Sequence, residues 1–170
     1  MDPIFAWIES SALSEWVRGS PCVCAFPTIV TLHNLGMAFL AGGGIAIDLR
    51  IIGFASAIPL KPMTRFVPLM WLAFGLNAAT GILLLIAYPT KALTNPLFYV
   101  KLSLVALAVW LVFRINRDIL QASEIDQKLL AGKAKGLAVI SLAAWGALIA
   151  AGRYLAYTHK WEMLGVPAIL

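Results

Sequence analysis

The stretch from Val67 to Tyr88, VPLMWLAFGLNAATGILLLIAY, decides the fold. It contains no charged residue, and Asn77 and Thr80 carry its only amide and aliphatic hydroxyl groups. A helix rises about 1.5 Å per residue, so about 20 apolar residues cross the hydrocarbon core of a bilayer. The stretch therefore predicts a membrane-spanning helix.

Three further apolar stretches have a similar length, and together they predict spans over about 27–54, 67–88, 96–114 and 136–157. Pro27 suits the first turn of the first span. The whole chain has 170 residues, of which 61% are hydrophobic and 12% charged, whereas soluble domains carry about 25% charged residues. We expect an all-α integral membrane protein, an up-down four-helix bundle over 25–170.

Residues 1–24 are expected to form an N-terminal interfacial helix and a linker. Over 3–18, Ile4, Ile8, Leu13 and Trp16 are separated from the charged and hydroxyl residues, a pattern that predicts a short amphipathic helix lying on the membrane surface. Packing against the end of the bundle is the alternative. The acidic start Met1-Asp2-Pro3, with no long apolar run after it, is not typical of a signal peptide.

Lysine and arginine are distributed unevenly between the two ends of the predicted spans. One face holds eight of them and the other three, with Lys101 and Arg153 inside spans; the eight are Arg50, Lys61, Arg65, Arg114, Arg117, Lys128, Lys133 and Lys135, and the three are Arg18, Lys91 and Lys160. The positive-inside rule puts the richer face in the cytoplasm. Both termini are then periplasmic in a bacterial inner (plasma) membrane, with Asp48 and Arg50 marking the cytoplasmic boundary of the first span.

The loop over 114–135 is the main cytoplasmic feature, and its apolar residues predict a helical continuation: Ile119, Leu120, Ile125, Leu129 and Leu130. The basic residues of the chain form no stripe, so nucleic acid is not an expected partner. Membrane lipids and other membrane subunits are.

Polar side chains inside spans are costly and usually face the interior of a bundle. Counted along the helices, His33 lies about 9 Å below the outer end of its span, and Lys101 and Arg153 about 6 to 8 Å below theirs. Asn34, Asn77 and Thr80 offer further hydrogen bonds, with Asn77 nearer the middle of the membrane. The sequence therefore predicts a basic cluster near the outer face.

No acidic residue in the spans lies at the depth of this cluster, which points to a ligand outside the chain. A haem propionate, a quinone carbonyl, a lipid phosphate or a carboxylate of a partner would each supply the missing acceptor. The alternative is that Lys101 and Arg153 extend to the interface and that His33 bonds to a backbone carbonyl.

Two metal-binding interpretations centre on His33. Ligation of one haem b by His33 and His159 is disfavoured because His159 follows the last span and lies at another depth, but a single His33 ligand or a haem shared with a partner stays open. Copper is the second interpretation, because His33 and Met37 share a helix face and Cys22 and Cys24 approach from the same side. A bond between these two cysteines, one residue apart, is expected to be strained.

No motif identifies a reaction. The sequence contains no P-loop, no G-x-G-x-x-G after a strand, no metalloprotease H-E-x-x-H and no Ser-His-Asp set. We therefore expect no autonomous enzyme.

Three segments taken together resemble a family: TLHNLGMAFLAGGGIAIDLRIIG, FGLNAATGILLLI and NPLFYVKLSLVALA. Their order and spacing over about residues 5–115 resemble an uncharacterised family of bacterial four-helix inner-membrane proteins, and more distantly the copper-resistance D and cytochrome b561-like group. The resemblance draws attention to His33, Asp48, Arg50 and Lys101. Members of the b561-like group bind haem through histidines on several helices.

Three functions follow as hypotheses. The first is a small membrane subunit or anchor of a redox or respiratory assembly, with a haem, quinone or lipid site at His33, Lys101, Arg153 and Asn77. The second is a purely structural subunit that packs against larger membrane partners. The third is a small transporter or copper-handling protein, which is disfavoured because no acidic residue is expected in the middle of a span.

Overall fold

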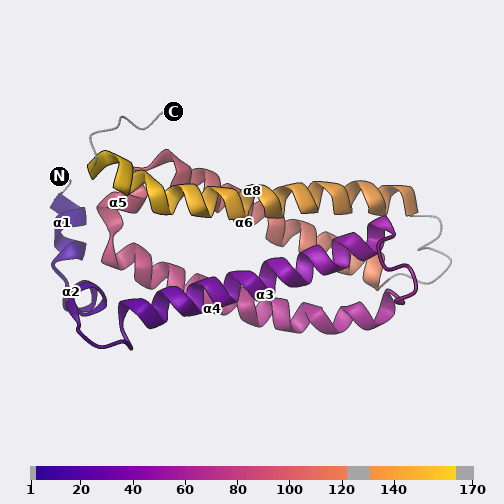
Figure 1. Cartoon of the computed structure of the whole chain (residues 1–170), viewed down its shortest axis with the longest axis horizontal. Helices are drawn as coiled ribbons and strands as arrows, with labels where there is room; N and C mark the ends of the chain where they lie inside the picture. Colours follow the sequence, from indigo (N-terminus) through magenta and orange to yellow (C-terminus); the bar gives the residue numbers. More distant parts are fainter. Residues whose placement is uncertain (1–2, 122–130, 164–170) are drawn as a thin grey trace. The chain divides into compact units, whose positions relative to one another are not determined.

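The computed structural model describes residues 3–121 and 131–163, which are almost entirely helical and contain no strand (Figure 1). Four helices are long and apolar enough to cross a membrane. The predicted all-α fold with four membrane-length helices is thereby confirmed. The chain is a multi-pass membrane protein by the length and composition of its helices.

The four long helices are α3 (Phe26–Ile52), α4 (Phe66–Ala87), α6 (Pro96–Ile115) and α8 (Ala131–Met163). The first three agree with the predicted spans to within two residues at each end. The last helix is longer than its predicted span at both ends. The first and last turns of α8 carry charged and polar residues. These residues continue the helix, but they are not apolar enough to lie in hydrocarbon.

Contacts divide the chain into two units. The first comprises Met1–Gly43 and Phe66–Thr94, and the second comprises Gly44–Arg65 and Asn95–Leu170, so that α3 contributes to both. Each unit is described separately. The predicted boundary between an N-terminal part and a bundle near residue 24 stays a prediction.

In the first unit, the segment expected as one amphipathic helix forms two short helices, α1 (Pro3–Glu9) and α2 (Ala12–Gly19). The break falls at Ser10 and Ser11, whose hydroxyl groups donate to backbone carbonyls three residues earlier. The Ser11 side chain also accepts a hydrogen bond from the Ser14 amide and caps α2. Serine competes for backbone partners in this way and favours a helix start over a helix interior.

Helix α2 packs against the end of α4, as the alternative interpretation of the segment expected. Val17 is fully buried and forms an apolar cluster with Ile29 and Ala87. The buried Ser14 hydroxyl group donates to the Ala87 carbonyl at 3.4 Å. Trp7 is 76% exposed on α1, the placement expected of an interfacial tryptophan, and a position on the membrane surface stays a prediction.

Close approach of α3 and α4 in the first unit depends on glycine. A Cβ atom added at Gly36 would lie 2.9 Å from the Ala73 carbonyl oxygen and 3.1 Å from Asn77, and one added at Gly43 would lie 2.8 Å from the Met70 side chain. Helices in membranes associate largely through such close backbone packing, because lipid is as apolar as the helices themselves.

Adding one methyl group at Gly36 tests this packing. We expect Gly36→Ala to be less stable than Gly42→Ala by about 1–3 kcal/mol, the usual result of overpacking. Both substitutions add the same methyl group and the same helix propensity to α3, but nothing lies within 4 Å of a Cβ atom at Gly42. Unfolding free energies measured in mixed micelles give the difference. Equal stability of the two variants would contradict the close approach at Gly36.

In the second unit, α6 and α8 run side by side (Figure 1). Helix α6 continues into a short π-helical turn, η2 (Asn116–Leu120), which packs against the 3₁₀ turn η1 (Lys61–Arg65). The Ile119 and Leu120 side chains are buried, in agreement with the predicted helical continuation. Ile125, Leu129 and Leu130 lie outside the described residues.

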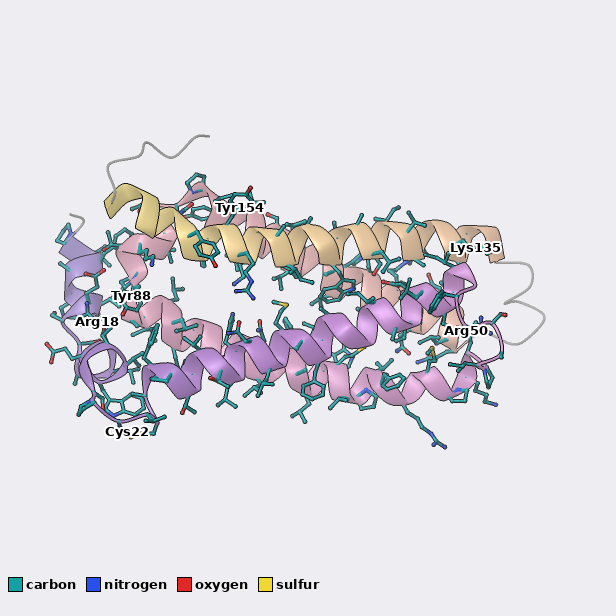
Figure 2. All side chains as sticks on the ribbon, viewed as in Figure 1. Arg18, Cys22, Arg50, Tyr88, Lys135 and Tyr154 are labelled. Atoms are coloured by element: carbon teal, nitrogen blue, oxygen red, sulfur yellow. A yellow bond between two sulfur atoms is a disulfide. The ribbon has the colours of Figure 1, made fainter. Side chains whose placement is uncertain are left out.

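Helix α3 ends in a turn at Gly53, which has a φ of +117°, a conformation that glycine adopts without strain. Arg50 closes the loop that follows, because its guanidinium group donates to the carbonyls of Ser56 and Ile58. Arg50 and Lys135 lie at the same end of the second unit (Figure 2). This agrees with the clustering of basic residues on which the predicted orientation rests.

Candidate functional site

The His33 side chain extends from α3 and contacts α4 in the first unit. Its Nδ1 atom lies 3.0 Å from the Asn77 carbonyl oxygen and 3.1 Å from the Thr80 hydroxyl oxygen. The Asn77 side-chain amide in turn donates to the His33 carbonyl at 2.7 Å. The ring and the backbone of His33 are therefore both attached to the same turn of α4.

These contacts determine which ring nitrogen carries a proton. A carbonyl oxygen only accepts, so the contact with Asn77 requires a proton on Nδ1. The Thr80 hydroxyl hydrogen is directed to the backbone, with the Leu76 carbonyl at 2.7 Å, so the Thr80 oxygen also accepts from Nδ1. In the neutral imidazole, Nε2 then carries the lone pair.

The surroundings of this network are tightly packed. Asn77 is 7% exposed and Thr80 4% exposed, and the His33 side chain is half-buried. A Cβ atom added at Gly81 would meet the His33 Cε1 atom at 3.2 Å. Sequence analysis named His33 and Asn77 as site residues, and the structure brings them together. Asn34, the next residue on α3, is exposed.

The other two predicted site residues belong to the second unit. Lys101 is half-buried in the second turn of α6, and Arg153 is exposed on α8. Because His33 belongs to the first unit and these two to the second, their convergence into one cluster stays a prediction.

Cys22 and Cys24 form a disulfide in the turn between α2 and α3 (Figure 2). The turn brings their Cα atoms to 5.1 Å, within the usual range for a disulfide; the expectation that the bond is strained stays a prediction. Paired sulfurs are not thiolates and do not supply the ligands that the copper interpretation requires.

Within residues 3–121 and 131–163, no three histidine, cysteine or acidic side chains are grouped so as to hold a metal ion. Met37 lies one turn after His33 and is half-buried. The side chain of His159 lies outside the described part. A site with His33 as the protein ligand of a prosthetic group is compatible with this finding.

A second polar cluster, which sequence analysis missed, lies in the second unit. Asp48 was expected at the aqueous boundary of the first span, but its side chain is only 1% exposed. Ser141 and Trp145 of α8 are fully buried beside this part of α3. Ser141 is in polar contact with the Asp48 carboxyl group, and the ring of Trp145 covers Gly44.

The register explains the grouping. Gly44 faces Trp145, and Asp48 faces Ser141. Moving one turn forward along α3 therefore corresponds to moving one turn backward along α8. The two helices are thus antiparallel here, with Gly44 leaving room for the indole ring. In the sequence, Gly44 and Asp48 are four residues apart, and so are Ser141 and Trp145. The sequence does not indicate that the two helices pack against each other.

No family profile, curated protein or solved structure matches this chain.

Proposed function

We propose that the chain is a small membrane subunit or anchor of a redox or respiratory assembly in a bacterial inner membrane, in which His33 would bind haem b. The observation that carries this proposal is the double hydrogen bond at His33 Nδ1. A histidine that binds a metal commonly donates its other ring N–H to a carbonyl or carboxylate, which sets the tautomer and the orientation of the ring.

The same tautomer favours haem over the other two ligands considered. A quinone carbonyl and a lipid phosphate are acceptors and require a donor. With the proton on Nδ1, Nε2 is the ring nitrogen of neutral His33 that would bind iron.

The role as a subunit follows from what the chain contains. The described segments between its long helices are short, and no motif for a reaction lies in them. An electron carrier of this kind requires donor and acceptor proteins, and His33 is the only histidine whose side chain belongs to the described part. A further protein ligand of the haem would therefore come from a partner.

Gentle purification from native membranes tests the assignment. We expect a haem b content near one per chain by the pyridine haemochrome assay, and co-purifying proteins with redox cofactors. Stoichiometric partners without haem would contradict the haem site and favour the purely structural subunit. Solvent extraction of the same sample distinguishes a bound quinone or lipid. A stable, cofactor-free protein without partners would contradict the whole proposal.

The proposed orientation makes a separate prediction. In a variant with Cys22→Ser and Cys24→Ser, a single cysteine at Lys91→Cys should react with a membrane-impermeant maleimide added to intact spheroplasts. A single cysteine at Lys135→Cys should react only after the membranes are broken, because the basic face is cytoplasmic. Both lysines are exposed, which makes the two variants a matched pair. The reverse pattern of labelling would contradict periplasmic termini.

A further inference from the structure

Three buried polar atoms of the Asp48 cluster, on neighbouring turns of α3 and α8, make no hydrogen bond of normal geometry within the described residues. They are Asp48 Oδ2, the Ser141 hydroxyl oxygen and Trp145 Nε1, and each of the three side chains is at most 1% exposed. A buried polar group without a partner destabilises a fold, and buried polar sites of this kind commonly hold water. We propose that Asp48, Ser141 and Trp145 form a proton-binding site, in which Asp48 exchanges a proton through a bound water.

The chemistry of the donors selects water and a proton over a metal cation. Trp145 Nε1–H can only donate, so it presents a partial positive charge that repels a cation. Water accepts from the indole N–H and donates to Asp48 Oδ2, and the Ser141 hydroxyl group can either donate to the carboxylate or accept from the water. One molecule thereby satisfies the three side chains.

The charges around the cluster leave Asp48 without an ion pair within the described residues. Arg50 on α3 is bonded to the carbonyls of the following loop. On α6 and η2, Arg114 and Arg117 both pair with Asp118. Lys61 and Arg65 on η1 and Lys133 and Lys135 on α8 are exposed. Further along the same helices, Lys101 on α6 is half-buried and Arg153 on α8 is exposed. The proton itself is then the counter-charge for Asp48.

The proposed step is a simple transfer. The Asp48 carboxylic acid gives its proton to the bound water while that water passes one of its own protons on to solvent, which leaves a carboxylate and a neutral water in the site; uptake is the reverse, and no electron is transferred. Because α3 ends only four residues later, at Ile52, the water would exchange with the side of the membrane that carries Arg50. An intramembrane carboxyl group commonly marks such a proton path. This site is independent of haem binding at His33.

Infrared difference spectroscopy of the full-length protein in lipid tests the site. We expect a protonated carboxylic acid band that shifts down in D2O and is lost on going to alkaline pH. The band should disappear in Asp48→Asn and persist in Asp118→Asn, whose carboxylate is partly exposed and paired. In Trp145→Phe, which keeps a ring and removes the N–H donor, the band should persist with a shifted midpoint.

Three results would overturn the proposal. One is a band that is unaffected by Asp48→Asn. Another is a band that neither exchanges in D2O nor titrates, which would make Asp48 a permanently protonated structural group. The third is an unchanged midpoint in Trp145→Phe. Should Asp48→Asn fail to fold, Ser141→Ala serves in its place, because loss of the hydroxyl group should also shift the midpoint of the Asp48 band.

Discussion

Haem should be absent from His33→Ala and present in Asn34→Ala at the level of the unmodified protein. The first substitution removes the nitrogen proposed to bind haem. The second truncates the next side chain of α3, which is exposed and polar, and therefore controls for a general effect on the helix. Haem content per chain, measured by the pyridine haemochrome assay after identical purification, gives the comparison.

The contacts of the ring make this prediction specific. Thr80→Val keeps the size of the side chain and removes the oxygen that lies 3.1 Å from Nδ1, so haem affinity should fall by about tenfold, as it does when groups behind a metal ligand are lost. A His33→Ala protein that retains its haem would contradict the assignment. Equal loss in Asn34→Ala would mean that the effect comes from folding and not from ligation.

Trp145→Ala should destabilise the protein by about 3 kcal/mol, the lower end of the range for buried tryptophan. Trp145 is fully buried over Gly44, and truncation would leave a cavity between α3 and α8 in the second unit. We use the lower end of this range because lipid is itself apolar, so the hydrophobic effect contributes little to the burial of a side chain between helices.

Trp110→Ala is the matched control for this cavity. Trp110 lies on α6 in the same unit and is 52% exposed, so its removal leaves no enclosed space and should cost much less than Trp145→Ala. Unfolding free energies in mixed micelles measure both variants. Similar losses for the two would contradict the packing of α8 on the second half of α3.

The long helices could be predicted from sequence because bilayer thickness imposes a length and an apolar composition on every span. Composition does not report how helices pair. For that reason the sequence predicts Asp48 at the boundary of the first span, although the antiparallel register of α3 and α8 buries it beside Ser141. A count of residues along a helix gives depth and says nothing about which neighbour a side chain faces.

Local features were predicted less well where a few hydrogen bonds decide the conformation. The hydroxyl groups of Ser10 and Ser11 divide the N-terminal segment into two helices, while its pattern of apolar residues alone favours one. The turn before α3 brings Cys22 and Cys24 together, which the spacing of the cysteines did not indicate. The sequence predicts that His33 and Asn77 are polar residues available for hydrogen bonds, but it does not predict that they bond to each other.

The visible spectrum of the unmodified protein, purified gently and recorded oxidised and after dithionite reduction, tests haem binding by His33. We predict the bands of a b-type haem, sharpened on reduction and missing from His33→Ala. A featureless spectrum of protein that retains its native partners would contradict a haem ligated by His33.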